Sequence, residues 1–303
     1  MADQPVPPSS PCRPLPLVLE LVGRLCRWLP PVRGKYRLAQ RLLAPLIRGK
    51  GYRTIVPLRS AGGGRLICCL DDWIPWTVFV FGRYISETED ERFMVSCAAG
   101  GPQGQTIFDI GANIGYYTVQ LARTAGPGAR LHAFEPVSST AALLAENVAL
   151  NGLRNVVVNR AIVSDTLGAQ PIYLSATANT GQSSLVRASA RSETVDTVTV
   201  DAYCQARNIE RIDLVKVDVE GHELRVLQGM AGLLRSGCVG CICAEANEEL
   251  LRANGASTAA MVDFMQRLGY RGRRLGAAPA DRRATSRPAA DGLLVFERGP
   301  GQP

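Results

Sequence analysis

The feature that most constrains the fold is a β-branched and aromatic run that leads into a turn with two glycines. Residues 106–110 (Thr-Ile-Phe-Asp-Ile) are followed by Gly111-Ala-Asn-Ile-Gly115 and then by an apolar-periodic segment. This order predicts a strand, a tight loop and a helix. A second run at 130–134 ends in Glu135. Since ligands of open parallel sheets bind at the carboxyl ends of strands, we expect a ligand site between the loop and Glu135.

The alternation of strand and helix patterns continues along the chain. Strands are predicted at 106–110, 130–134, 155–160, 213–217, 239–244, 270–275 and 292–297, and helices at about 115–124, 138–150, 222–235 and 256–268. Parallel strands with helical crossovers, finished by a hairpin-like pair, predict an α/β fold with a doubly wound sheet and one antiparallel strand.

The domain boundaries follow from composition. Residues 1–14 are rich in proline and serine and are expected to be disordered, and 15–84 to form an N-terminal extension. The main domain is expected at 85–298, with a tail at 299–303. Within it, the Ala/Pro/Arg-rich segment 276–291 is expected to be a mobile loop.

The extension has three expected parts. Residues 15–46 are expected to be an amphipathic helical region broken at Pro30-Pro31 and Pro45. Residues 52–70 are expected to be a strand pair, and the aromatic-rich stretch 71–84 a packed wall over the sheet. A further helix is expected at about 87–96.

Charge is concentrated at the start of the chain. Residues 1–60 contain eleven basic and two acidic residues, a formal charge of +9 in a chain whose total is +7. Such a basic arm could make a peripheral contact with anionic lipid, or contact nucleic acid or an acidic partner domain. The plainer interpretation is a solvated arm that keeps the protein soluble.

Cysteine usage and hydropathy indicate a reducing, cytoplasmic setting. Nine cysteines, an odd number, do not suggest a disulfide framework, and Cys238-x-x-Cys241 has neither a second pair nor nearby histidines for zinc. We expect these two thiols to be buried as small apolar groups. The apolar stretch 15–22 is short and contains Glu20, so we expect no transmembrane segment.

The position of Asp109 distinguishes between nucleoside cofactors. A nicotinamide fingerprint would need a middle glycine that the turn lacks, and a carboxylate at Asp109 would repel a pyrophosphate. It suits a ligand with an ammonium group instead. S-adenosylmethionine (SAM) has one, together with a sulfonium, a ribose diol and an adenine, and it has no phosphate.

Each part of this ligand has an expected contact. Gly111 and Gly115 would let the backbone pass close to the methionine portion, and Asp109 would orient the ammonium directly or through water. Glu135 would accept hydrogen bonds from the ribose hydroxyls. Ala161 and Ile162, at the expected end of the third strand, would flank the adenine. The alternative is an ordinary tight turn with solvated carboxylates.

A second cluster follows the fourth predicted strand, where Asp218, Glu220, His222 and Glu223 occur within six residues. Catalytic groups of such sheets collect at this edge, and methyl transfer to a hydroxyl or amide needs a proton acceptor. We therefore expect Asp218, Glu220 and His222 to be catalytic. The alternative is that Asp218 or Glu220 caps the following helix. A divalent metal on Asp218, Glu220 and Glu245 is conceivable, but the spacing does not require one, and none is predicted.

These residues resemble the FkbM family of SAM-dependent methyltransferases. The resemblance covers roughly residues 85–250. The matching stretches are Phe108-Asp-Ile-Gly-Ala-Asn-Ile-Gly-Tyr-Tyr-Thr118, Ala133-Phe-Glu-Pro136, Glu146-Asn-Val-Ala-Leu-Asn-Gly152, Ala161-Ile-Val-Ser-Asp165, Ser183-Ser-Leu185, Val200-Asp201 and Ile212-Asp-Leu-Val-Lys-Val-Asp-Val-Glu-Gly-His-Glu223.

The resemblance implies a class I methyltransferase fold with a seven-stranded sheet and, usually, O-methylation of hydroxyls on sugars or secondary metabolites. It assigns cofactor roles to Asp109, Gly111, Asn113, Gly115 and Glu135. It marks the cluster of Asp218, Glu220 and His222 as a family feature without a role for each member. The implied acceptor is a small or glycosylated molecule.

Three alternatives remain open at this point. The basic arm favours a nucleic-acid methyltransferase, but no Asn-Pro-Pro-Tyr follows the fourth strand and the main domain is not basic. A nicotinamide oxidoreductase fits the turn less well, and a non-catalytic scaffold would use the fold for partner binding alone. The oligomeric state is not predicted.

Overall fold

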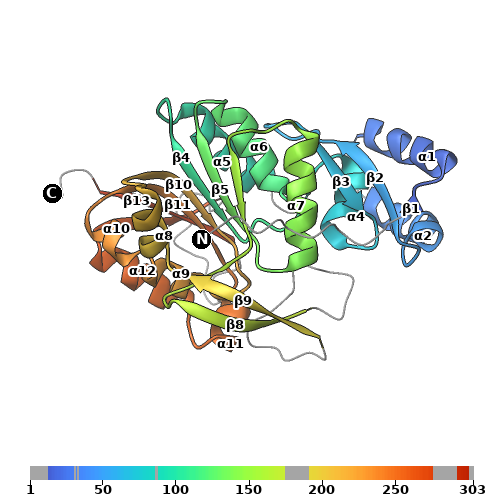
Figure 1. Cartoon of the computed structure of the whole chain (residues 1–303). Helices are drawn as coiled ribbons and strands as arrows, with labels where there is room; N and C mark the ends of the chain where they lie inside the picture. The colour runs from blue at the N-terminus through green and yellow to red at the C-terminus, as the bar shows by residue number, and fades with distance from the viewer. Residues whose placement is uncertain are drawn as a thin grey trace, which may run out of the picture.

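A seven-stranded sheet forms the centre of the molecule, with strand order β12-β13-β11-β10-β4-β5-β6 (Figure 1). The computed structural model describes residues 13–30, 32, 34–85, 88–174, 191–275 and 292–299. In this sheet, β13 runs antiparallel to both of its neighbours, and the other neighbouring pairs are parallel. The predicted doubly wound sheet with one antiparallel strand is therefore confirmed.

The predicted strands of this sheet are confirmed to within a residue or two. They are β4 (Thr106–Ile110), β5 (Arg130–Phe134), β6 (Val156–Asn159), β10 (Ile212–Val217), β11 (Val239–Ala246), β12 (Tyr270–Arg274) and β13 (Gly292–Arg298). Three of the predicted helices are α6 (Tyr116–Ala125), α7 (Ser138–Leu150) and α12 (Thr258–Arg267).

The single helix predicted at 222–235 is wrong, because it is two helices, α9 (Glu223–Gln228) and α10 (Ala231–Arg235). The chain between them passes so close to a neighbouring segment that a Cβ on Gly229 would lie 2.0 Å from the Ser164 carbonyl oxygen. The Asp201 carboxylate then accepts hydrogen bonds from the backbone N–H groups of Gly232 and Leu233. These contacts start a new helix rather than continue the first.

Alternation along the strands divides the core between the two faces of the sheet. Neighbouring residues of a strand point to opposite faces, so Ile107 and Leu214 join one buried cluster and Phe108 and Val215 join the other. The first cluster is covered by α6, α7 and α5 (Thr88–Gly100), and the second by α9, α12 and α8 (Val200–Arg207). The strands read as nearly continuous apolar runs because both faces are buried.

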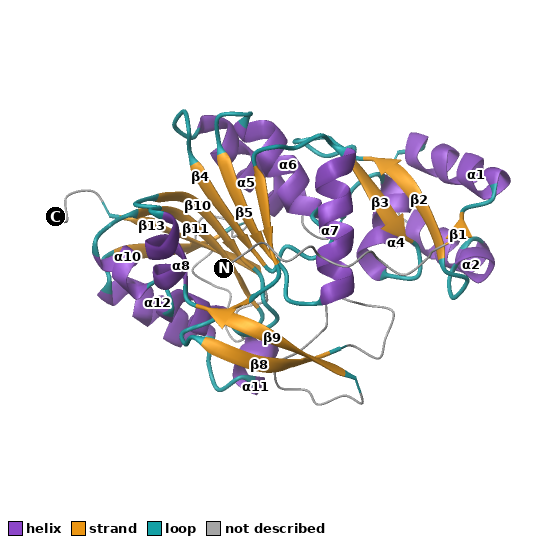
Figure 2. Cartoon of the chain, viewed as in Figure 1, coloured by secondary structure: helices purple, strands orange, loops and turns teal. Residues whose placement is uncertain are grey.

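A second sheet was not predicted. It has the order β7-β9-β8, with β7 (Ile162–Val163), β8 (Gly168–Tyr173) and β9 (Ser192–Val198), and Figure 2 shows β8 and β9 beside the carboxyl edge of the large sheet. The prediction that 161–163 ends the third strand of the large sheet is therefore wrong. That strand, β6, ends at Asn159, whose amide donates to the Ala133 carbonyl and whose oxygen accepts from Tyr203.

The N-terminal extension packs against the side of the large sheet that carries α7 (Figure 1). It contains β1 (Arg13–Pro14), α1 (Leu17–Trp28), α2 (Lys35–Leu42), α3 (Ala44–Ile47), β2 (Tyr52–Pro57), β3 (Arg65–Cys69) and α4 (Trp73–Phe81). The strand pair and the interrupted helical region are confirmed. The aromatic wall is the helix α4, in which Trp76 and Phe79 are fully buried.

The expected disordered start was 1–14: residues 1–12 fall outside the described residues, and Arg13 and Pro14 form the strand β1, paired with β2, so for them the expectation is wrong. The loop expected at 276–291 and the end of the tail, 300–303, also fall outside the described residues. Within the described ranges, no helix has the length and apolar character needed to cross a bilayer. The eight cysteines of these ranges are all free thiols, with Cys238 and Cys241 half-buried.

Asn147 on α7 joins the extension to the loop that precedes α6. Its side chain is fully buried. Its Oδ1 accepts from the Ile67 backbone N–H at 2.6 Å, and its Nδ2 donates to the Ile114 carbonyl at 2.8 Å. One amide therefore satisfies a buried donor on β3 and a buried acceptor on the loop.

We predict that Asn147→Ala lowers the free energy of unfolding by about 2–4 kcal/mol, because two buried backbone groups lose their partner. Urea denaturation followed by circular dichroism measures this change. Asn151→Ala is the matched control: its side chain also bonds backbone, at Arg65, but near solvent, so its cost should stay below about 1 kcal/mol. Equal losses for the two variants would contradict the role given to Asn147.

Candidate active site

A cavity lies at the carboxyl ends of β4, β5 and β10 and brings together most of the predicted site residues. Its polar and charged lining includes the predicted Asn113, Glu135, Asp218, Glu220 and His222, and also Lys216, Glu245 and Asn254. The predicted Gly111, Ala161 and Ile162 also line it, whereas Asp109 and Gly115 do not.

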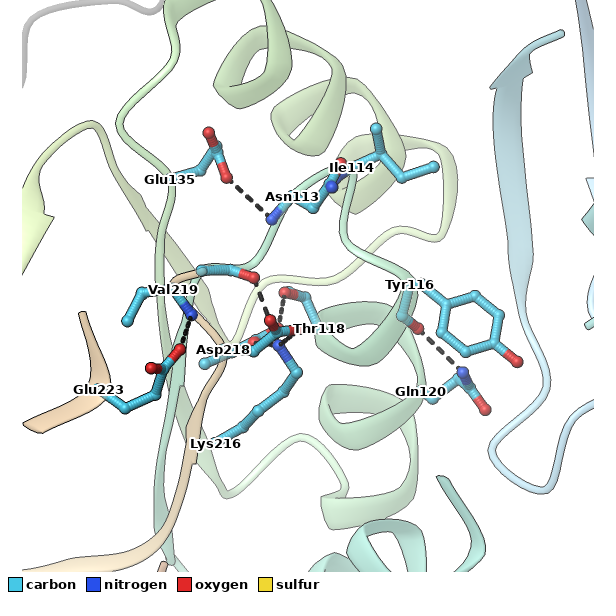
Figure 3. Close-up of polar contacts among 12 residues, drawn as sticks. Asn113, Ile114, Tyr116, Thr118, Gln120, Glu135, Lys216, Asp218, Val219 and Glu223 are labelled. Carbon is cyan, nitrogen blue, oxygen red and sulfur yellow. Dashed lines mark hydrogen bonds and ion pairs between the residues drawn. The ribbon is translucent and has the colours of Figure 1, made fainter. Parts of the chain in front are cut away.

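Glu135 is fixed by the backbone around the cavity. Its Oε2 accepts from the Asn113 N–H at 3.0 Å, and its Oε1 accepts from the Val137 N–H at 3.0 Å (Figure 3). Burial raises the pKa of Glu135 to about 7, although the two N–H donors favour its ionised form. Each oxygen can accept a further hydrogen bond, so the carboxylate can receive two hydroxyls from the cavity.

The glycine-containing loop is shaped by a close approach to β10. Gly111 has a φ of +78°, and a Cβ there would lie 1.8 Å from the Asp218 carbonyl oxygen, so the position excludes any side chain. Asn113 also has a positive φ, of +50°, and its Oδ1 accepts from the Ile114 N–H. Gly115, with a φ of +89°, begins α6 behind the loop.

Asp109 is fully buried beneath this loop, and its charge is met by Lys216. Its Oδ2 accepts from the Thr118 hydroxyl at 2.5 Å, and its Oδ1 lies 3.5 Å from Lys216 Nζ. Because Asp109 does not reach the cavity lining, a direct contact with a ligand ammonium would require the loop to move. Its predicted cofactor role stays a prediction.

Lys216 has no role in the sequence-based prediction, although the structure places it at the centre of the site (Figure 3). It is almost fully buried, and its Nζ lies 3.1 Å from Asp218 Oδ2 and 3.3 Å from the Gly111 carbonyl. The sequence contains one signal for this role, a lysine inside an apolar strand. Because lysine is almost never buried without a partner, its position there indicates a buried acidic partner.

Asp218 lies between Lys216 and a second acid. Burial would raise the pKa of Asp218, but the ammonium of Lys216 and a hydrogen bond with Glu245 outweigh it and hold that pKa below its usual range. Asp218 is therefore ionised at neutral pH and faces the cavity. It can attract a cation such as a sulfonium or ammonium group.

Glu220 and Glu223 take different roles. Glu220 lines the cavity with a φ of +54°, a left-handed conformation that costs a non-glycine residue about 1–3 kcal/mol. Such strain clusters at functional sites. The buried Glu223 instead accepts from the Val219 and Gly221 N–H groups at 3.1 Å, so it stabilises the turn itself.

His222 is held by a chain of polar side chains. Its Nε2 lies 2.9 Å from the Ser164 hydroxyl, which donates to Asp165 at 3.0 Å, and Asp165 pairs with Arg225. If Ser164 gives its only proton to Asp165, Nε2 of His222 carries a hydrogen and Nδ1 is the acceptor. Burial lowers the pKa of His222 to about 4, so the ring is neutral at physiological pH.

The remaining walls are apolar and aromatic. The segment 161–163 lines the cavity from β7, although its strand differs from the predicted one. The extension adds Trp73 and Tyr84, from the stretch for which the sequence favours a packed wall over a stacking platform. Among the described residues, no group of three or more His, Cys, Asp or Glu side chains is arranged to hold a metal ion.

The sheet order, with its antiparallel strand next to one edge and its cavity at the glycine loop, defines a class I methyltransferase fold. The sequence profile described as the methyltransferase FkbM domain matches residues 109–271. The chain belongs to this family. Membership confirms the resemblance of the motifs to the FkbM family.

Two curated relatives are similar to part of this chain. The hexuronic acid methyltransferase AglP of Haloferax volcanii is 31% identical over 134 residues, which cover 44% of this chain and 53% of the relative. The methyltransferase sdnD of Sordaria araneosa is 29% identical and matches 43% of this chain and 61% of its own length. The chain thus spans only about half the length of the curated relatives that it matches.

Solved structures resemble this chain more distantly. A SAM-dependent O-methyltransferase of Thermotoga maritima has a TM-score of 0.41 and 13% sequence identity, covering 71% of this chain and 66% of that protein. A likeness at this level carries no argument about activity.

We predict that Lys216→Met lowers the free energy of unfolding by about 3–5 kcal/mol, because it leaves the Asp109 carboxylate buried without its cation. Adding Asp109→Asn should restore at least about 2 kcal/mol, since the neutral amide needs no cation and its oxygen can still accept from Thr118. Guanidinium denaturation of the four proteins gives this double-mutant cycle. Additive losses would show that the two side chains are not coupled.

Proposed function

We propose that this protein transfers the methyl group of SAM to a hydroxyl oxygen of a sugar or secondary-metabolite acceptor. The observation that carries the proposal is that Glu135 and the polar group of Asp218, Glu220 and His222 line a single cavity. The side with Glu135 suits the hydroxyls of a nucleoside. The side with Asp218, Glu220 and His222 suits a cationic centre and supplies a proton acceptor.

The cavity residues fit SAM on chemical grounds. Glu135 would accept the ribose hydroxyls with the lone pairs that its two backbone donors leave available. Ala161 and Ile162 would contact the adenine, and the backbone at Gly111 and Asn113 would lie along the methionine portion. Asp218 would attract positive charge, and Lys216 would neutralise the methionine carboxylate.

When bound, SAM supplies an electrophilic methyl group that is transferred in line to the acceptor oxygen. The protein must align that oxygen and remove its proton. We assign the proton to Nδ1 of His222, which the chain from Arg225 through Ser164 would keep in the required tautomer. A base with a pKa of about 4 suffices, because the hydroxyl becomes strongly acidic as the new bond forms.

The acceptor class rests on the cavity walls and on the relatives. Trp73 and Tyr84 offer aromatic surface for the apolar face of a sugar ring, and Glu220, Glu245 and Asn254 offer hydrogen bonds to hydroxyls. The relative from Haloferax volcanii is a hexuronic acid methyltransferase. A nucleic-acid acceptor gains no support here, since Lys216 is the only lysine or arginine among the described lining residues.

Titration calorimetry with SAM tests the cofactor assignment. We predict that Glu135→Ala weakens SAM binding at least about tenfold, through the loss of two hydrogen bonds. Binding to the unaltered protein should also weaken as the pH falls below about 7, because protonation of Glu135 removes hydroxyl acceptors. Glu146→Ala, which removes a half-buried carboxylate outside the cavity, is the control and should bind normally. Failure of the unaltered protein to bind SAM would refute the proposal.

Labelled SAM with a set of uronic acids, glycosides and phenolic metabolites tests the reaction, with mass spectrometry for a product one methyl heavier. With an accepted substrate, we predict that His222→Asn lowers kcat roughly 10²–10⁴-fold and leaves the Kd for SAM unchanged. At saturating SAM, kcat should fall only below about pH 4–5, as His222 becomes protonated. An unchanged kcat would exclude His222 as the base.

A further inference from the structure

Helix α1 has its polar and apolar faces reversed relative to an ordinary surface helix. Two of its three charged residues, Glu20 and Arg27, face the protein, and Arg27 is only 5% exposed, whereas Arg24 is exposed. Five of its apolar residues face solvent, led by Leu17 at 73% and Trp28 at 72% exposure, with Val18, Leu21 and Leu25 between them, whereas Leu19 packs against the core. At 100° per residue these five side chains lie on one stripe. A surface helix normally buries such a stripe.

The reversed orientation is fixed by specific contacts with α4. A Cβ on Gly23 would lie 2.3 Å from the Phe79 ring, so the two helices pack closely at that glycine. Arg27 donates to the Phe79 carbonyl at 2.8 Å and lies over the Phe79 ring, and it pairs with Glu20. Because buried charges without partners are costly, α1 cannot rotate its leucines inward.

The same end of the molecule exposes further apolar and cationic side chains. Helices α1 and α2 lie at the end farthest from the large sheet (Figure 1). The exposed apolar side chains of α2, α3 and β2 are Leu38, Leu42, Leu46 and Ile55, and Arg37 and Arg41 are exposed beside them on α2. A hollow between α1 and β2 places Arg24 and Arg59 next to Leu25 and Trp28.

We propose that α1, α2 and α3 form a docking surface for an anionic lipid bilayer. Leucines with a tryptophan among cations are the composition of helices that lie in the plane of a membrane interface. The apolar side chains would enter the boundary between headgroups and acyl chains. Arg24, Arg37, Arg41 and Arg59 would meet lipid phosphates, and the charge of +9 over residues 1–60 would attract the negative surface.

Charge favours a bilayer over the two other partners that this surface could bind, a second copy of the chain and nucleic acid. A second copy of the chain would bring a second +9 segment against the first, and like charges oppose that contact. Nucleic acid would satisfy the arginines, but its phosphate backbone offers no apolar partner for the exposed stripe of α1. A bilayer with anionic headgroups satisfies both kinds of side chain.

Co-sedimentation of the full chain with phosphatidylcholine vesicles, with and without phosphatidylserine, tests the proposal. We predict binding to the phosphatidylserine vesicles that weakens as salt is raised. Leu21→Glu/Leu25→Glu should reduce the partition coefficient at least about tenfold, because it removes two leucines that the bilayer would bury. Leu167→Glu, at an equally exposed leucine before β8, is the matched control and should leave binding unchanged.

Charge is tested separately. Arg37→Glu/Arg41→Glu should lower binding to phosphatidylserine vesicles by at least about fivefold for each cation removed. Arg154→Glu/Arg235→Glu, which reverses two exposed arginines outside the extension, is the control. All these side chains are exposed, so thermal unfolding should show intact folds.

Tryptophan fluorescence provides a second readout. The chain has three tryptophans, of which Trp76 is fully buried, Trp73 half-buried and Trp28 largely exposed. Vesicles should therefore shift the emission to shorter wavelength through Trp28, and Trp28→Phe should abolish the shift.

Three results would overturn the proposal. One is no binding to either kind of vesicle together with a dimer in analytical ultracentrifugation that Leu21→Glu/Leu25→Glu dissociates, which would assign the surface to a second copy. Another is equal vesicle binding by all variants. The third is salt-sensitive binding to RNA without binding to vesicles. Since SAM binding is measured separately, failure here leaves the proposed methyl transfer intact.

Discussion

The buried ion pair between Asp109 and Lys216 is the interaction on which the site depends. The two residues are direct partners across the parallel pair of β4 and β10, so the ladder itself sets their side chains together. Lys216 also reaches Asp218 and the Gly111 carbonyl, and so joins the glycine loop to the cluster of Asp218, Glu220 and His222. Asp109, which the sequence suggests as a ligand contact, thus lies behind the cavity and holds Lys216 in place.

The architecture of the large sheet could be predicted because local and long-range signals agree. The strands are apolar runs bounded by turn residues, and the acids and glycines that follow them mark one edge. Helices whose ends depend on tertiary contacts were harder to predict from the sequence. The division between α9 and α10 arises from the contact of Gly229 with the Ser164 backbone, and nothing in the helix pattern itself reveals that neighbour.

The sequence predicted most of the residues that line the site, but not the contacts between their side chains. Glu135, Asp218, Glu220 and His222 all line the cavity, as the strand-end argument requires. The pairing of Lys216 with Asp109 and the chain from His222 through Ser164 to Asp165 depend on distances between separate strands. The second sheet was missed because its strands β8 and β9 are half-exposed, and the inward positions of β9 include the polar Glu193 and Thr197, so its sequence shows no apolar alternation.

One aromatic contact joins the proposed docking surface to the cavity. Tyr36 of α2 packs edge-on against Trp73, with ring centroids 5.4 Å apart, and Trp73 is also a cavity wall. A substitution at Tyr36 that altered the proposed docking surface would therefore also disturb Trp73, the ring that we propose contacts the acceptor. We therefore expect the proposed membrane contact and the choice of acceptor to have evolved together.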